Sequence, residues 1–379
     1  MRGQTDDQLP LFHVFNVEER IRSDHPLRDI KRRVDRILAS MSARFETAYS
    51  RTGRPSVPPE RLLKALLLMA LYSVRSERQL CERIDTDLLF RWFLDLQPSD
   101  AAFDATTFTH NRQRLEDHDL TKTFFGAVVS EALAAGLCSE HFSVDGTLIE
   151  SFASAKSFQP KGSDDEPKDS NGFQPRNAEV DFHGQKRTNE THQSRTDAES
   201  RLYRKGPGKE AKLAHLGHAL GENRHGLIMA ISVTEANGTA ERSATFAMLD
   251  ELQTTRGVQP KTLGADKGYD DGQFFQDMEA RQIDLHVPLS KPLGDPKGER
   301  HLDRRRGMEA RQRMQARGHT DGYRLSQKCR KKIEEVFGWL KGIAGLGRSR
   351  VVGRWKLQQL LEVGAAAYNL VRLRKLKPA

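Results

Sequence analysis

The sequence predicts an α/β protein in which a mixed sheet flanked by helices follows an all-helical N-terminal region. Residues 141–152 alternate apolar and polar side chains, as a half-buried strand does. Residues 59–72 carry leucines on most faces of a helix, which is typical of the central helix of a bundle. Beyond residue 212 strands alternate with helices along the chain, and this order favours a sheet covered by helices.

Bulk composition limits the class of protein. A chain of 379 residues is long enough for two or three domains. Its longest apolar segment, residues 62–71, is interrupted by Lys64 and is too short to span a membrane, and the first residues do not resemble a signal peptide. The three cysteines match no zinc-binding spacing. We therefore expect a soluble protein of the reducing cytoplasm.

Capping signals and apolar spacing predict several short helices in residues 1–137. One amphipathic helix is expected at residues 27–41, before the apolar helix at 59–72. Ser76 and Gln79 form a capping box, and Asp87 is placed to cap the next helix. Short helices joined by tight turns are similar to a helix-turn-helix bundle, although most small helical bundles do not bind DNA.

A helix that begins at Thr106 is the candidate DNA-binding helix of this region. We expect its exposed side to carry His110, Asn111, Arg112 and Arg114. Arg112 and Arg114 are therefore candidate phosphate contacts. A further amphipathic helix, residues 119–136, ends at a glycine and leads into the strand at 141–152.

The second part of the chain, residues 138–376, is expected to form one sheet domain. The predicted elements after the first strand are a hairpin of strands at 212–220 and 227–237, a helix at 241–252, a strand ending at Asp266, a helix at 272–281, a strand at 283–289, and helices at 328–343 and 357–376. Two segments have few apolar residues and no periodicity. We expect residues 155–211 to be a mobile insertion and residues 290–325 to be a charged loop.

Two aspartates occupy positions where a carboxylate is unusual. Asp145 lies in the centre of an apolar strand, where a buried carboxylate is costly unless it is paired or binds a metal. Asp266 follows a short strand and precedes a glycine-containing loop, at the kind of strand end where ligands bind in open sheets. Asp270 is expected to cap the next helix, with Gln273 at the capping-box position. Taken alone, the pattern around Asp145 favours a solvent-facing position at a sheet edge, and only the other acidic segments change that interpretation.

A third acidic position lies on the helix at residues 328–343. Arg330, Glu334 and Lys341 recur at i, i+4 and i+11, which places them along one helix face. On an isolated helix this pattern would favour a solvated Arg–Glu pair. His215 and His218 do not favour a metal site, because a spacing of three puts them on opposite faces of a strand.

Charge points to a polyanionic partner. The net charge is +9, with a pI near 9.4. From Lys341 to the C-terminus there are nine Lys or Arg residues and one acid. Within this segment Arg348, Arg350 and Arg354 interleave with Trp355, a pattern common in proteins that contact nucleic acid.

The motifs VDGTLIES, GADKGYDD and R-x3-E-x6-K, in this order, resemble the catalytic core of bacterial insertion-sequence transposases of the DDE type. The resemblance extends over the N-terminal third, through GRPSVPPERLLKALLLMALY, RSERQL, FRWFL and TTFTHNRQRL. The family's helix motif begins with a tyrosine, Y-x2-R-x3-E-x6-K, but this chain has Gln327 there. Whether Tyr323, one helical turn upstream, replaces that tyrosine is left open by the sequence.

This resemblance implies a fold and an activity. The order of strands and helices matches a ribonuclease H-like sheet, with residues 1–137 as the DNA-binding part and 138–376 as the catalytic part. Asp145, Asp266 and Glu334 would hold Mg²⁺ or Mn²⁺, with two ions expected, for DNA cleavage at the element's ends and strand transfer. Arg330 and Lys341 would neutralise phosphate charge.

The expected partner is double-stranded DNA, bound by a homodimer associated with the nucleoid. Two other functions remain open. One is a nuclease of the same fold that does not transfer strands. The other is an inactive DNA-binding relic or repressor.

Overall fold

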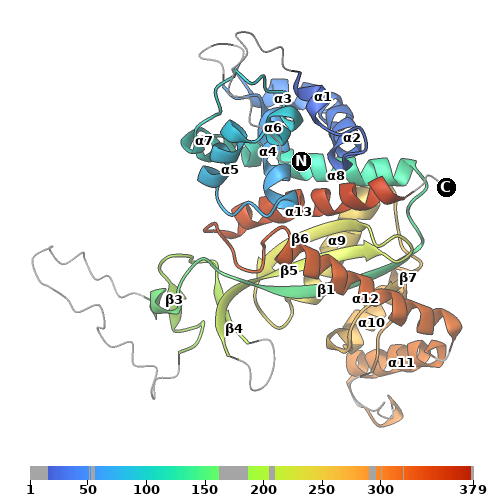
Figure 1. Ribbon diagram of the computed structural model, residues 1–379. Coiled ribbons are helices and arrows are strands. Elements are labelled where there is room, and N and C mark those ends of the chain that lie inside the picture. The colour runs from blue at the N-terminus through green and yellow to red at the C-terminus, as the bar shows by residue number, and fades with distance from the viewer. Residues whose placement is uncertain are drawn as a thin grey trace, which may run out of the picture.

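The computed structural model describes residues 16–50, 52, 56–161, 187–204, 210–289, 296–299, 301–318 and 320–376. Figure 1 shows a helical N-terminal bundle above a curved sheet, with a smaller helical lobe at one end of the sheet. No helix in the described ranges is long and apolar enough to cross a membrane.

The N-terminal bundle agrees with the predicted helices. Its helices are α1 (Val17–Arg20), α2 (Pro26–Ser40), α3 (Ser42–Ala48), α4 (Pro59–Leu71), α5 (Glu77–Thr86), α6 (Leu88–Phe93), α7 (Ala105–Asp117) and α8 (Leu120–Ala134). Nine of the 13 residues of α4 are buried, as expected of a central helix. The predicted caps are also present: Ser76 Oγ accepts from Gln79 N at 3.1 Å, and Asp87 Oδ1 from Leu89 N at 2.9 Å.

The sheet is mixed, as predicted. Its strands are β1 (His141–Glu150), β4 (Arg201–Tyr203), β5 (Lys212–Glu222), β6 (Ile228–Glu235), β7 (Thr262–Gly264) and β8 (Asp284–His286). The order is β4-β5-β1-β7-β8, and β6 also pairs with β5. The pairs of β5 with β1, β4 and β6 are antiparallel, whereas β7 is parallel to both β1 and β8. This is the succession of strands expected of a ribonuclease H-like sheet.

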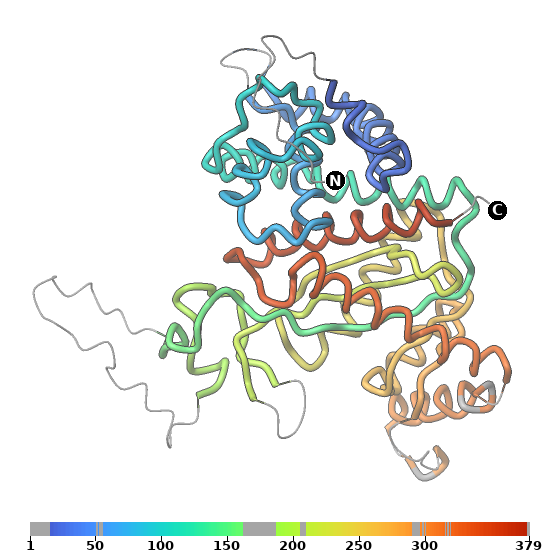
Figure 2. Tube along the Cα trace, in the orientation of Figure 1, coloured from blue at the N-terminus to red at the C-terminus, as the bar shows by residue number. Residues whose placement is uncertain are grey.

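Helices cover both faces of the sheet and connect it to the bundle. They are α9 (Ala240–Arg256), α10 (Gly272–Ala280), α11 (Leu302–Arg317), α12 (Asp321–Gly342) and α13 (Arg354–Lys375). Helix α12 crosses β1, β7 and β8, while α9 packs on β5 and β6. Helix α13 lies between β6 and helices α2, α4 and α8, as the tube in Figure 2 shows. The apolar core is therefore continuous from the bundle into the sheet.

The expected charged loop at residues 290–325 is wrong, because this range contains α11 and the start of α12. Helix α11 has few apolar residues, but Ala310 and Met314 are buried against α10. Gly307 also meets Gly272 so closely that a Cβ on Gly272 would lie 3.1 Å from Gly307 Cα. The helix is thus formed by tertiary packing, which its composition did not reveal.

The expected mobile insertion at 155–211 is wrong for the part that the structure describes. Two short strands, β2 (Phe158–Pro160) and β3 (His192–Ser194), form a separate ribbon, and β4 joins the main sheet. A buried network anchors this segment: Asp197 accepts from Ser151 Oγ at 2.7 Å and lies 3.0 Å from His215 Nε2. Residues 162–186 and 205–209 lie outside the described residues.

Candidate active site

Asp145 lies on the central strand of the sheet. It pairs with Ala219 of β5 and is half-buried. Two residues earlier, Ser143 faces α12, because a Cβ on Gly264 would lie 2.9 Å from Ser326 Oγ and 3.2 Å from Ser143 Oγ. Since side chains two apart on a strand share a face, Asp145 also points to the side of the sheet that α12 covers.

Asp266 lies beside Asp145 at the carboxyl end of the parallel strands. Gly264, the last residue of β7, is opposite Ser143 of β1, so Asp266 and Asp145 each lie two residues beyond this last pair. The Asp266 carboxylate accepts a hydrogen bond from Gly268 N at 2.8 Å, which fixes the turn after the strand. The structure thus brings the two predicted aspartates to one edge of the sheet.

The neighbouring Asp270 does not have its predicted role. Helix α10 is capped by Asp271, whose Oδ1 accepts from Phe274 N at 3.1 Å. Asp270 instead forms a two-point ion pair with Arg311 of α11, at 2.7 and 2.8 Å. The helix starts one residue later than the capping pattern suggested, because the pairing with α11 holds Asp270 in the preceding turn.

The rotation of α12 directs Glu334 toward the same edge. Lys332 Nζ donates to the carbonyls of Asn223 and Arg224, both at 2.7 Å, in the β5–β6 turn near the amino end of β1. Successive helical residues are 100° apart, so Glu334 lies about 200° from Lys332 and faces the carboxyl ends of β1 and β7. Its side chain is 61% exposed, and Arg330 lies 3.7 Å away.

Other residues of the helix motif hold α12 against the sheet. Gln327 Nε2 donates to His286 O of β8 at 2.6 Å. Tyr323 packs edge-on against the His286 ring, with 5.5 Å between centroids. Lys341, at the other end of the helix, packs against Gly347, whose carbonyl accepts from Glu150 N at 3.1 Å. Gln327 therefore acts as a structural link to β8.

The donor atoms at this edge suit a hard divalent cation. The three predicted acids offer only carboxylate oxygens, the ligands that Mg²⁺ and Mn²⁺ prefer. Within the described ranges, no three Asp, Glu, His or Cys side chains converge closely enough to hold an ion. The Glu334 side chain is the most exposed of the three predicted acids, at 61%.

Glu241 and Tyr269 are two residues at this edge that the sequence did not single out. Glu241 lies in the first turn of α9, against Gly146 of β1. Tyr269 is fully buried in the turn after Asp266. The available signal was the glycine next to Asp145, which leaves space for a neighbouring side chain.

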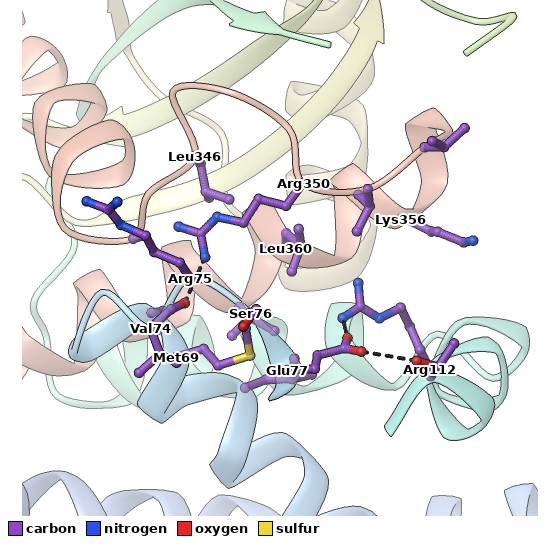
Figure 3. Close-up of a pocket in the computed structure, with 17 residues that line it drawn as sticks. Met69, Val74, Arg75, Ser76, Glu77, Arg112, Leu346, Arg350, Lys356 and Leu360 are labelled. Atoms are coloured by element: carbon purple, nitrogen blue, oxygen red, sulfur yellow. Dashed lines mark hydrogen bonds and ion pairs between the residues drawn. The ribbon is translucent and has the colours of Figure 1, made fainter. Parts of the chain in front are cut away.

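The predicted exposed side of α7 is partly wrong. Asn111 and Arg112 are buried, at 6% and 8% exposure. Arg112 forms an ion pair with Glu77 of α5 (Figure 3), and burial lowers the pKa of its guanidinium. Arg114 lies over the Tyr49 ring at 4.6 Å. Helix α7 packs between α5 and α13. The Asn111 and Arg112 side chains therefore point into the protein rather than toward solvent.

Two of the three predicted C-terminal arginines have partners in the protein. Arg350 donates to Val74 O at 2.7 Å and to Gly345 O at 3.2 Å, which ties the loop before α13 to the bundle (Figure 3). Arg354 contacts Glu199 through its backbone N at 2.7 Å and its guanidinium at 3.3 Å. Arg348 is exposed.

Two pockets lie where the bundle meets the C-terminal segment. The pocket in Figure 3, of about 400 Å³, has a mainly apolar wall from α4 and α13. A wider pocket of about 880 Å³ lies beside the end of α12. It is lined by Ser73, Arg75, Phe152, Lys341, Gly342, Gly345, Gly347, Arg348, Ser349 and Arg350. Its lining therefore includes four cationic side chains and no acidic one.

Comparisons with known proteins agree with this architecture. Residues 15–114 match the model of a family described as "Transposase domain (DUF772)", and residues 137–370 match "Transposase DDE domain". No curated protein matches the chain.

Solved structures similar to the chain include a Mos1 transposase paired-end complex with the left transposon end, at 12% identity and a TM-score of 0.21, covering 79% of this chain and 82% of that one. A pre-cleavage Mos1 transpososome matches at 11% identity and a TM-score of 0.20, covering 87% and 82%. The DDE family model spans more than half of the 379 residues. The chain belongs to the DDE transposase family.

Proposed function

We propose that this transposase cleaves DNA strands at the ends of its mobile element and joins the freed 3′-hydroxyls to target DNA, in reactions that need a divalent metal ion. The observation that carries the proposal is the position of the acids. Asp145 and Asp266 each follow the last paired residues of β1 and β7 by two positions, and the contacts of Lys332 support a rotation of α12 that turns Glu334 toward this edge. These positions support a site to which three separate elements each contribute one carboxylate.

Asp145, Asp266 and Glu334 would hold Mg²⁺ or Mn²⁺, with two ions expected. The ions would activate a water or a 3′-hydroxyl and stabilise the leaving oxygen of an in-line displacement. Asp145 and Asp266 are half-buried on rigid backbone and would give the site its fixed part. Arg330, with 20% of its side chain exposed, is placed beside Glu334 to neutralise phosphate charge.

The DNA would run over the cationic pocket beside α12. Lys341 connects this pocket to the helix that carries Glu334, and Arg75 and Arg348 add exposed positive charge. Phe152, at 51% exposure, offers an aromatic face in the same wall. Such a mixture of cations and an aromatic ring supports binding of phosphates and bases. Because a mobile DNA element has two ends, we expect one copy of the protein to bind each end, as a homodimer.

The test is a cleavage and joining assay with the purified full-length protein, Mg²⁺ and DNA that carries the element's flanking sequence. Asp145→Asn and Asp266→Asn should abolish cleavage and joining but keep DNA binding. Asp277→Asn on α10, whose carboxylate accepts from Gln273 at 2.9 Å, is the matched control and should retain activity.

The products separate the proposal from its alternatives. Cleavage without joined products would indicate a nuclease, and binding without either would indicate a relic or repressor. Full cleavage by the Asp145 or Asp266 variant would exclude these carboxylates from the reaction.

A further inference from the structure

Glu241 comes close to Asp145 from the side of the sheet opposite α12. Helix α9 packs on the face formed by the even-numbered residues of β1, where Leu148 lies in an apolar cluster with Ala236 and Ala240. Gly146 is on that same face. A Cβ on Gly146 would lie 2.6 Å from Glu241 Oε1, 2.9 Å from its Cγ and 3.1 Å from its Cδ. The missing side chain at residue 146 therefore lets the Glu241 carboxylate lie against the strand, next to Asp145.

A second, independent feature marks the same place. The hydroxyl of Tyr269 is buried, and it makes no well-aligned hydrogen bond with a described residue. The Thr245 hydroxyl, which donates to Glu241 O at 2.8 Å, is a polar neighbour of the Tyr269 hydroxyl. Burial raises the pKa of Tyr269 well above its usual value, and the negative charges of Glu241, Asp145 and Asp266 raise it further. Glu241, Asp145 and Asp266 are therefore all close enough to act electrostatically on one buried hydroxyl.

We propose that Glu241 is a fourth carboxylate of the metal site, an inference that rests on the proposed function. It adds an oxygen ligand from α9, whereas Glu334 approaches from α12. Carboxylates gathered at one edge repel each other, and a divalent cation between them relieves that repulsion. Tyr269 is the positioning residue: its hydroxyl donates to a ligand carboxylate once that carboxylate turns toward the ion, which satisfies an otherwise unpaired buried donor.

The simpler role for an acid in the first turn of a helix is to interact with the helix dipole. That role keeps a side chain near the first backbone N–H groups of its own helix. Glu241 instead directs its carboxylate at β1, and the adjacent position of that strand is occupied by a glycine. The geometry therefore favours a ligand over a charge that stabilises α9.

The test is titration of the DNA-free, full-length protein with Mn²⁺, followed by calorimetry. Glu241→Gln keeps the shape of the side chain but removes its charge, so Mn²⁺ affinity should fall by about tenfold or more. Glu251→Gln, on the same helix and paired with Lys122 at 3.0 Å, is the matched control and should bind Mn²⁺ as the unchanged protein does. Equal affinity of the Glu241 variant and the unchanged protein would overturn the inference.

A second variant displaces the Glu241 carboxylate by steric clash. Gly146→Ala places a methyl group where Glu241 lies, so Mn²⁺ affinity should again fall. Gly238→Ala is the control, because a Cβ at residue 238 meets nothing within 4 Å. Circular dichroism checks that all variants fold.

Asp145→Asn separates this inference from the proposed function. If Asp145→Asn weakens Mn²⁺ binding and both Glu241→Gln and Gly146→Ala leave it unchanged, the proposed function stands and Glu241 is not a ligand. If Asp145→Asn and Asp266→Asn also bind Mn²⁺ normally, the metal site itself is absent and both proposals fail.

Discussion

Two adjacent glutamates on α12, Glu334 and Glu335, point in different directions and are expected to have different roles. Glu334 and Glu335 differ by about 100° in direction, so both cannot face one metal site. Glu334 lies near Arg330 on the flank that faces the carboxyl ends of β1 and β7. Glu335 lies 4.0 Å from Arg372 of α13, so it points toward the C-terminal helix rather than toward the site.

We therefore predict that Glu334→Gln removes cleavage and strand transfer, whereas Glu335→Gln keeps most of both. The ion pair of Glu335 is largely exposed, so its loss should cost less than about 1 kcal/mol of stability. Cleavage assays on proteins matched by circular dichroism test the ranking. The opposite ranking would mean that α12 is rotated relative to this structure.

Burial of His218 predicts that the stability of the folded protein depends on pH. It is fully buried on β5, its Nε2 lies 2.7 Å from Thr234 Oγ1, and burial lowers its pKa from 6.5 to about 4. The unfolded chain therefore binds a proton between pH 6.5 and about 4 that the folded chain does not, and stability falls as pH decreases through this window.

The loss attributable to His218 should approach about 3 kcal/mol at the acid end. Urea unfolding of the unchanged protein and of His218→Gln, measured at several pH values from 7 to 4, tests this expectation. The variant should lose less stability over the window. Parallel pH profiles of the two proteins would show that another group is responsible.

Elements with strong periodicity were predictable from the sequence, and those formed by tertiary contacts were not. The central strand, the β5–β6 hairpin, and helices α2, α4 and α12 follow from apolar spacing and capping residues. Helix α11 was missed because little more than Ala310 and Met314 signals its buried face. The inward direction of Arg112 depends on Glu77, 35 residues away, which no local pattern reveals. Glu241 was missed for the same reason, since only folding brings α9 against β1.

The loop between α12 and α13 illustrates the difference between a cation that binds within the protein and one available to a partner. Arg348 is exposed in the pocket beside α12, whereas the Arg350 guanidinium binds the carbonyls of Val74 and Gly345. Arg348 and Arg350 are two positions apart, but we expect their substitution to affect different properties, DNA binding for Arg348 and stability for Arg350.

Arg348→Ala should weaken DNA binding and reduce the slope of log affinity against log salt by about 1, as expected for one lost phosphate contact. Arg350→Ala should chiefly lower the melting temperature, because it leaves two carbonyls without their donor. Fluorescence anisotropy from 50 to 200 mM salt, together with thermal melting, tests the pair. A change in slope confined to Arg350→Ala would place the DNA contact elsewhere.

At the scale of the whole molecule, α13 joins the two parts of the chain. It packs on β6 and on four helices of the bundle, α2, α4, α7 and α8, and its Glu362 accepts from Thr121 of α8 at 2.6 Å. The Arg350 and Ser73 contacts fasten the preceding loop to the bundle as well. These contacts join the bundle to the sheet, and the cationic pocket lies beside the end of α12. We propose that this arrangement directs DNA from the bundle to the carboxylates.

The most direct test of the central claim is a crystal structure of the protein bound to DNA from one end of its element, soaked with Mn²⁺. Anomalous scattering locates manganese independently of any assumption about the ligands. We expect one or two manganese peaks between Asp145 and Asp266, within reach of Glu334 and beside the scissile phosphate. Bound DNA with manganese elsewhere, or with the scissile phosphate far from Asp145 and Asp266, would contradict it.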